Sequence, residues 1–210
     1  MTQKGIWIVI EGIDGAGKTT VISTIERVFS QFNLMTKVYR EPGGTLLGEG
    51  VRSLLKADNL SILPVAEVLL LYAARIQLLE EQILPCLEQG THVILDRHEL
   101  STFAYQSGGR GLDTDVISKI SQACMPNRKP DLTFFLAVKP EVGLERVKKR
   151  GQLDHYESQS LEFFQRIALS YERFIGDYPN VICIDANQTF EEVQQDIVTE
   201  LENFFAAKFA

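Results

Sequence analysis

The stretch Gly12-Ile13-Asp14-Gly15-Ala16-Gly17-Lys18-Thr19 decides how this chain folds. It follows a short apolar run, Ile6–Ile10, and precedes a helical pattern, which is the context that the phosphate-binding pattern GxxxxGK[ST] requires. Glycines let the backbone wrap around phosphate oxygens, successive N–H groups form an anion site, and the next helix presents its positive end. The motif predicts a nucleoside triphosphate site, but it does not say what is done with the triphosphate.

Donor and metal contacts follow from this loop. Lys18 is expected to reach the β- and γ-phosphates, and Thr19 offers a hydroxyl group to Mg²⁺, the expected cofactor. Asp96, at the end of an apolar run, is placed like an acidic residue that holds Mg²⁺ through water, although it could instead cap a following helix. The remaining donor contacts are assigned to Gly12, Ile13, Asp14, Gly15, Ala16, Gly17 and Thr20.

Further apolar runs extend the pattern on both sides of Asp96. They are nearly continuous, as expected for strands covered on both faces of a parallel sheet, and they alternate with helical periodicities. Apolar residues spaced by three and four predict helices from Leu161 to Ile175 and from Phe190 to Phe204. We therefore predict an α/β fold with a five-stranded parallel sheet flanked by helices, with ligands beyond the carboxyl ends of the strands. The strands are expected at Ile6–Ile10, Thr36–Arg40, Thr91–Leu95, Leu132–Val138 and Val181–Asp185.

Composition limits the class of protein. The 210 residues, 45% of them hydrophobic, suit one domain spanning 1–210. With 21 basic and 28 acidic residues the net charge is -7, so no nucleic-acid partner is expected and anionic ligands need local cations. The first apolar run is too short for a signal peptide core or a membrane span. Three scattered cysteines, Cys86, Cys124 and Cys183, indicate reduced thiols in a cytoplasmic protein.

Small-molecule kinases are the favoured class at this size, because the guanine-reading NKxD element of GTPases is absent from the sequence. Such a kinase needs a second anion site, and Arg40 and Arg97 both follow predicted strands near the loop. It also needs a closing segment, for which the basic run Arg146–Gly151 is the candidate. Each arginine could be a solvated surface residue, and the basic run could be a solvated helix end. A kinase for another nucleotide or nucleoside, or a P-loop binding protein without transfer activity, stays open on these grounds.

With these pieces together, the sequence resembles thymidylate kinase over nearly its whole length. The P-loop alone is shared with many enzymes, whereas the ordered set of motifs is specific to that family. The matching segments are 11–20, Arg40-Glu41-Pro42-Gly43-Gly44-Thr45, Tyr72-Ala73-Ala74-Arg75, Asp96-Arg97-His98, 101–106, Pro130-Asp131-Leu132 and Arg150-Gly151 with Asp154.

The resemblance implies a P-loop nucleoside monophosphate kinase fold with a mobile lid at about 143–157. The implied activity is transfer of the γ-phosphoryl group of ATP to dTMP in dTTP biosynthesis, by a homodimer joined through the region from Pro64 to Leu87. Because no cation occupies positions 13–16, the chain resembles the bacterial subtype whose lid supplies the catalytic arginine, here Arg150. The implied catalytic residues are Lys18, Arg40, Arg97 and Arg150, and Arg146 would contact ATP.

Acceptor contacts are implied by the same resemblance. Asp14 would accept a hydrogen bond from the sugar 3′-OH, and Arg40 and Arg97 would hold the acceptor phosphate. Arg75 would bond a carbonyl of the thymine ring, and Tyr105 would block a ribose 2′-OH. The base pocket would be completed by Leu71, Ser101 and Gln106.

Three sites in the sequence bear on how closely the chain follows the family pattern. Leu71 stands where the family commonly stacks a Phe on thymine, which removes aromatic stacking. His155-Tyr156 stands where related lids often carry Asp-Arg and then Ile, so one lid cation becomes titratable. Family members often have a cis bond before a proline, and Glu41–Pro42 is the candidate here.

Overall fold

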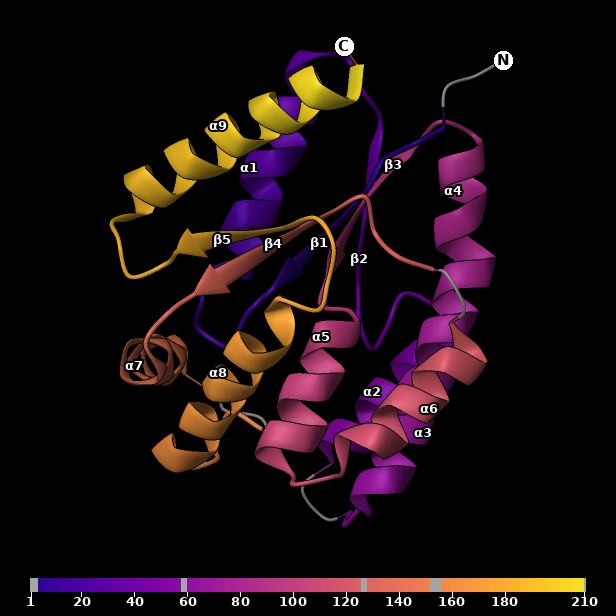
Figure 1. The fold of residues 1–210 in the computed structure, drawn as a ribbon, viewed down its shortest axis with the longest axis vertical. Helices are drawn as coiled ribbons and strands as arrows, with labels where there is room; N and C mark the ends of the chain where they lie inside the picture. The colour runs from indigo at the N-terminus through magenta and orange to yellow at the C-terminus, as the bar shows by residue number, and fades with distance from the viewer. Residues whose placement is uncertain (1–3, 58–59, 126–127, 152–155, 210) are drawn as a thin grey trace.

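Five parallel strands form the centre of the protein, in a computed structural model that describes residues 4–57, 60–125, 128–151 and 156–209 (Figure 1). Their order in the sheet is β2-β3-β1-β4-β5. The predicted five-stranded parallel sheet is therefore confirmed, with each boundary within one residue of the expected one. The strands are β1 (Trp7–Glu11), β2 (Thr36–Arg40), β3 (His92–Asp96), β4 (Leu132–Ala137) and β5 (Val181–Asp185).

Strand register brings chemically important residues to one edge of the sheet. Asp96 pairs in register with Ile10 on one side and with Arg40 on the other. Glu11, the last residue of β1, is therefore at the same carboxyl end as Arg40 and Asp96. This is the edge at which parallel α/β sheets bind ligands.

Helices cover both faces of the sheet (Figure 1). The helix predicted at 161–175 is confirmed with the same bounds, and the last helix runs beyond Phe204 to Phe209. Among the described residues, none of the helices has both the length and the apolar character needed to cross a bilayer. The helices are α1 (Lys18–Gln31), α2 (Leu46–Lys56), α3 (Pro64–Leu78), α4 (Leu84–Glu88), α5 (Glu99–Thr102), α6 (Thr114–Cys124), α7 (Pro140–Arg150), α8 (Leu161–Ile175) and α9 (Phe190–Phe209), with π-helical turns η1 (Leu79–Ile83) and η2 (Phe103–Gly109).

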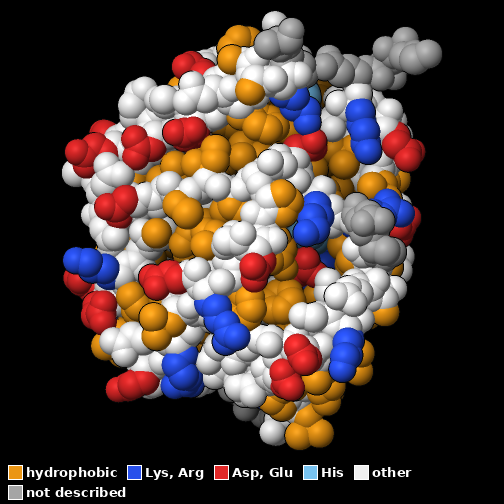
Figure 2. Space-filling view, viewed as in Figure 1, with side chains coloured by type: hydrophobic (Ala, Val, Ile, Leu, Met, Phe, Trp, Pro, Cys, Tyr) orange, Lys and Arg blue, Asp and Glu red, His pale blue; other side chains and the backbone are white. Residues whose placement is uncertain are grey.

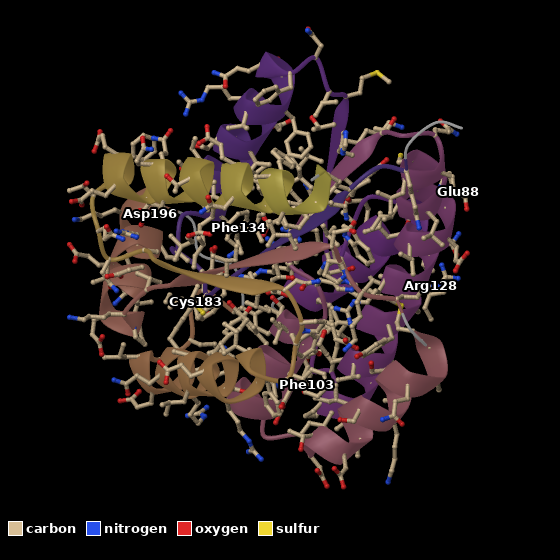
Figure 3. All side chains as sticks on the ribbon, turned by 45° about the horizontal axis from the view of Figure 1, so that its top comes forward. Glu88, Phe103, Arg128, Phe134, Cys183 and Asp196 are labelled. Atoms are coloured by element: carbon tan, nitrogen blue, oxygen red, sulfur yellow. The ribbon has the colours of Figure 1, made fainter. Side chains whose placement is uncertain are left out.

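Alternation along the strands divides the core between the two faces. Ile8 and Ile10 of β1 pack with α1 and α9, whereas Trp7 and Val9 pack with α3 and α4. This follows from the two-residue period of a strand. Phe134 lies on the α9 side and Phe103 on the α8 side of the sheet (Figure 3).

The two edge strands depart from the sequence prediction of full coverage. β2 and β5 are largely intermediate or exposed, whereas β1, β3 and β4 are buried almost throughout. Each edge strand has a neighbouring strand on one side only, so it stays partly accessible. Hydrophobic side chains gather over β5, between α8 and α9, on the face that Figure 2 shows.

Candidate functional site

Residues 12–17 join β1 to α1 and form the candidate binding loop for the phosphoryl donor, called the donor loop. Glycines shape this loop. Gly15 and Gly17 have φ angles of 79° and 95°, in the left-handed region that favours glycine. Lys18 is the first residue of α1, and its Nζ donates to the carbonyl oxygens of Gly12 and Ile13, both at 3.1 Å. Burial, together with the nearby Arg97 guanidinium, lowers the pKa of Lys18 below its usual range. The lysine is thus held inside the loop that the sequence motif identified.

A cavity of about 550 Å³ opens beside this loop. The structure brings together here residues expected to bind the triphosphate, the metal and the acceptor phosphate. Its lining includes Lys18, Thr19, Arg40, Asp96, Arg97 and Arg146.

Asp96 fits a hydrated cation better than a helix cap. The N-cap of α5 is His98, so the capping role that remained open for Asp96 is not what the structure has. Its Oδ1 atom is buried and has no hydrogen-bond partner among the described residues. A buried carboxylate oxygen is costly unless a donor or cation meets it. Together with the Thr19 hydroxyl in the same cavity, it suits the oxygen ligands that Mg²⁺ prefers.

Helix α7 packs directly on the donor loop. A β-carbon on Gly15 would lie only 2.1 Å from the carbonyl oxygen of Gly143, so the two backbones meet with no room for a side chain. Arg146, one turn later, donates from Nη1 to the carbonyl oxygens of Gly15 and Ala186, at 3.4 and 3.0 Å. Arg146 is therefore not merely a solvated residue of a basic helix end, and it joins α7 to the loop that follows β5.

Arg97 connects the donor loop to the second anion site. Its Nη2 atom donates to Asp14 Oδ1 at 2.5 Å and to Tyr105 Oη at 3.0 Å, and Tyr105 donates in turn to Asp14 Oδ2 at 2.8 Å. Its Nη1 atom donates to the carbonyl oxygen of Gly12 at 2.9 Å and to Ser101 Oγ at 3.2 Å. Arg97 has a φ of 70°, uncommon for a residue with a side chain, and the bonds around it hold it there.

Opposite charges in this cluster stabilise each other. Burial by itself raises the pKa of Asp14, but Arg97 and then Lys18 outweigh it and hold this pKa well below its usual range. Burial raises the pKa of Tyr105 far above its usual range, so its hydroxyl stays protonated and able to donate. Asp14 is thus a carboxylate at any pH at which an enzyme of this kind would work.

A second, smaller cavity of about 130 Å³ lies next to the first, and Asp14 and Arg97 line both. The structure brings together here residues that the resemblance assigned to the base and the sugar of the acceptor. They are Leu71, Arg75, Ser101, Tyr105 and Gln106, joined by Tyr156 and His98.

This smaller cavity is the candidate acceptor cavity. Arg75 enters it as a buried cation, with a side chain only 2% exposed. Its Nε donates to Glu41 Oε2 at 2.6 Å, and its Nη2 donates to Thr102 Oγ1 at 2.9 Å and to the carbonyl oxygen of His98 at 3.1 Å. Its Nη1 atom is buried with no hydrogen-bond partner among the described residues. One donor therefore remains for a ligand.

Glu41 is held by Arg75 and by His98, whose Nδ1 lies 2.9 Å from Glu41 Oε1. The Glu41–Pro42 bond is cis, as the resemblance suggested. Burial raises the pKa of Glu41, but Arg75 and then His98 outweigh it, so the pKa lies below its usual range. Glu41 thus fixes the cation of the acceptor cavity.

This shift predicts a loss of stability in acid. A carboxyl group whose pKa is depressed in the folded state contributes stability above its unfolded pKa, about 4.3, and loses it as pH falls through the folded value. We expect the free energy of unfolding to fall between about pH 5 and pH 3, and less steeply in Glu41→Gln. Urea unfolding across this range is the measurement, with the exposed Glu88→Gln as control. Equal slopes in Glu41→Gln and wild type would contradict the assignment.

Arg40 is the exposed counterpart of Arg97. Its Nη2 pairs with Glu49 Oε2 at 2.9 Å, with side chains 52% and 47% exposed. It lines the larger cavity but not the smaller one. Its arrangement is that of a surface cation which a phosphate could draw away from Glu49.

Two buried carboxylates in the site were missed by sequence reasoning. Glu11 accepts from the backbone N–H of His98 at 2.8 Å and from the hydroxyl groups of Ser101 and Tyr171 at 2.5 and 3.0 Å. Glu67 accepts from Gln106 Nε2 at 2.5 Å. Each is an acid among apolar residues, a signal that could have been read from the sequence.

Some sequence predictions fall outside the description. Asp154 and His155 lie outside the described residues. Arg150 is the last residue of α7, but its side chain is not among the described parts of the structure. The departure at Leu71 is visible, and this side chain is buried in the wall of the acceptor cavity.

Comparison with known proteins agrees with this arrangement. A family model described as thymidylate kinase matches residues 10–197. A thymidylate kinase of Legionella pneumophila (strain Corby) is 46% identical over 202 residues, covering 95% of each chain. One from Pseudoalteromonas translucida (strain TAC 125) is 44% identical over 205 residues, covering 97% of this chain and 99% of its own. Joined donor and acceptor cavities, the ordered motifs and these matches lead to one conclusion: the chain belongs to the thymidylate kinase family.

Proposed function

We propose that this protein transfers the γ-phosphoryl group of ATP to dTMP, giving dTDP and ADP. The observation that carries the proposal is the pair of adjoining cavities that share Asp14 and Arg97 as lining residues. One cavity adjoins the P-loop. The other holds the buried Arg75, whose Nη1 atom has no hydrogen-bond partner in the part of the chain that the structure describes. Two phosphorylated substrates can thus meet at a common wall, as phosphoryl transfer requires.

Positioning and charge are the main contributions of the protein to this reaction. The second pKa of a phosphate monoester is about 6, so the attacking oxygen of dTMP is already anionic at neutral pH. What opposes the reaction is repulsion between two polyanions. Lys18, Arg40 and Arg97 line the larger cavity and would offset this repulsion and stabilise charge on the transferred group.

Thr19 and Asp96 would hold Mg²⁺ in this site. When bound, the ion neutralises charge on the donor phosphates. Asp96 Oδ1, buried without a hydrogen-bond partner among the described residues, supports the assignment. Lys18 Nζ donates to the backbone carbonyl oxygens of Gly12 and Ile13, and a phosphate oxygen could replace either of them. Arg146 and the loop around Ala186, which are hydrogen-bonded to each other, would flank the rest of ATP.

Nucleoside recognition would fall to the smaller cavity. Arg75 would give its unpaired Nη1 to a carbonyl of thymine, and Leu71 would cover the ring by apolar contact. Ser101 and Gln106 would complete the base pocket. Asp14 already accepts from Arg97 and Tyr105, but a carboxylate has about four lone-pair sites and can still accept from the sugar 3′-OH.

Tyr105 is expected to make the enzyme prefer deoxyribose. Its hydroxyl is bonded to both Asp14 and Arg97, so its ring cannot move aside for a ribose 2′-OH without breaking both bonds. We expect kcat/KM for dUMP to exceed that for UMP by about 10- to 100-fold, the range that overpacking penalties imply. In Tyr105→Phe the ratio should shrink, even though both rates fall. Equal rates on dUMP and UMP in the wild type would rule out this role.

An acceptor panel tests the proposed function. ADP release with Mg·ATP is measured for dTMP, dUMP, dCMP, dGMP, AMP, UMP and thymidine. We expect strong release with dTMP, weaker release with dUMP and little with the others. Preference for another monophosphate would overturn the base assignment, and no release with any acceptor would support a P-loop binding protein instead.

We further propose one kinase domain over 1–210, with residues 143–157 acting as a mobile lid that brings Arg150 to the phosphates. A cytoplasmic homodimer is the expected form. The support for a dimer is a set of exposed apolar side chains on α2 and α3, where a soluble monomer would rarely gather them. These are Leu46, Leu47, Leu54, Val65 and Leu69.

A further inference from the structure

Glu67 lies on the helix face that forms the acceptor cavity. Glu67, Leu71 and Arg75 are spaced by four residues on α3, so they follow one another along one face of the helix. Leu71 and Arg75 line the cavity, and the Glu67 side chain beside them is only 2% exposed. Burying a carboxylate is unfavourable unless partners meet it, so its partners indicate what it does.

Those partners come from two other segments of the chain. Glu67 Oε1 accepts from Gln106 Nε2 on η2, at 2.5 Å, and from the hydroxyl of Tyr156. Its Oε2 lies 3.5 Å from Arg110 Nη2. Gln106 and Tyr156 both line the acceptor cavity. One buried carboxylate thus holds two cavity walls that lie 50 residues apart in the sequence.

Tyr156 adds a connection to the proposed lid. It is the first described residue after 152–155, at the end of the segment expected to close over the phosphates. Its ring meets that of Tyr105 edge-on, with centroids 6.0 Å apart and an interplanar angle of 81°. Burial, followed by Glu67, raises the pKa of Tyr156 above its usual range, so its hydroxyl remains a donor.

We propose that Glu67 is the positioning residue of the base end of the acceptor pocket, holding Gln106 and Tyr156 against the nucleobase. The inference rests on the proposed function, because it assigns a place to the acceptor base. Glu67 itself acts through its two partners, since it does not line the cavity.

The test compares Glu67→Gln, Tyr156→Phe and their double variant in the full chain. Tyr156→Phe keeps the ring and removes only the hydroxyl that meets Glu67, so it tests the same contact with little risk to folding. Tyr178→Phe is the matched control, because the Tyr178 hydroxyl also interacts with a carboxylate, Glu99, away from the acceptor cavity. The experiment measures KM for dTMP, KM for ATP and the inhibition constant of 2-deoxyribose 5-phosphate, which is an acceptor analogue without a base.

We expect each single variant to raise KM for dTMP by about 3- to 10-fold, the effect of a lost hydrogen bond. The double variant should be little worse than Glu67→Gln, because the hydroxyl that Tyr156→Phe removes is proposed to act through Glu67. KM for ATP and the inhibition constant of 2-deoxyribose 5-phosphate should stay within about two-fold of wild type, since neither ligand places a base in the acceptor cavity. Tyr178→Phe should leave all three constants unchanged.

Three outcomes would overturn the inference alone. They are an unchanged KM for dTMP in Tyr156→Phe, additive effects of the two substitutions, and equal losses for dTMP and the base-free analogue. Failure of the wild type to phosphorylate dTMP would instead overturn the proposed function, and this inference with it.

Discussion

Replacing Arg150 by alanine is expected to lower kcat for dTMP by about 10³-fold or more, the range known for arginines that contact a transferred phosphoryl group. Arg150 is the last residue of α7 and lies one turn beyond Arg146, whose guanidinium reaches the donor loop. Residues spaced by four share a helix face, so positions 146 and 150 belong to one face of α7. The affinity for dTMP should change little, because the acceptor cavity is lined by other cations.

Lys149→Ala is the matched control for Arg150→Ala. It removes the same charge one position earlier, from a side chain that pairs with Glu145 on the exposed side of α7 at 2.6 Å. Pre-steady-state kinetics of ADP formation, with calorimetric titration of dTMP, separates chemistry from binding. Similar kcat values for the Arg150→Ala and Lys149→Ala variants would remove Arg150 from the mechanism.

Arg97→Met is expected to destabilise the fold as well as impair the reaction. Arg97 and Asp14 form an ion pair with side chains 17% and 22% exposed. Removal of Arg97 would take away the nearer cation of Asp14 and leave Lys18, whose Nζ is 4.0 Å from Asp14 Oδ1. We expect a loss of about 3 kcal/mol in the free energy of unfolding, near the lower end for broken buried pairs. Adding Asp14→Asn should recover part of this loss, because the carboxylate that has lost its nearer cation is then gone.

Arg40→Met provides the contrast, because Arg40 is proposed to bind the same phosphate from an exposed pair with Glu49. Its stability cost should stay within about 1 kcal/mol, as for surface ion pairs. Both variants should lower kcat/KM for dTMP. Urea unfolding measures the stability loss of each variant, and steady-state kinetics measures kcat/KM. Equal stability losses in Arg97→Met and Arg40→Met would contradict the role assigned to burial of the Arg97 pair.

Local patterns in the sequence were sufficient to predict the sheet and the donor loop. The glycine-rich loop and the helix that it precedes depend on neighbouring residues, and the strands are short apolar runs with clear ends. The exposure of β2 and β5 was not predictable in the same way. It depends on which strands lie at the edges, and strand order is set by packing between segments far apart in the chain.

The contacts of the site were harder to predict, because they link distant segments. That Arg97 follows a strand could be read from the sequence, but its bonds to Asp14 span 83 residues. Glu41 was known only as part of a motif, and its bonds to Arg75 and His98 appear only in the folded chain. Glu67 could have been noticed from the sequence, because it precedes Leu71 and Arg75 at intervals of four residues on an apolar helix.

The bonds that Arg97 makes to the donor loop have a consequence for how the two substrates influence each other. Because one guanidinium contacts Gly12 and Asp14 and also lines the acceptor cavity, the proposed donor and acceptor sites belong to a single hydrogen-bonded network. Their binding free energies are then coupled, and linkage makes the coupling reciprocal: by whatever factor ATP changes the affinity for the acceptor, the acceptor changes the affinity for ATP.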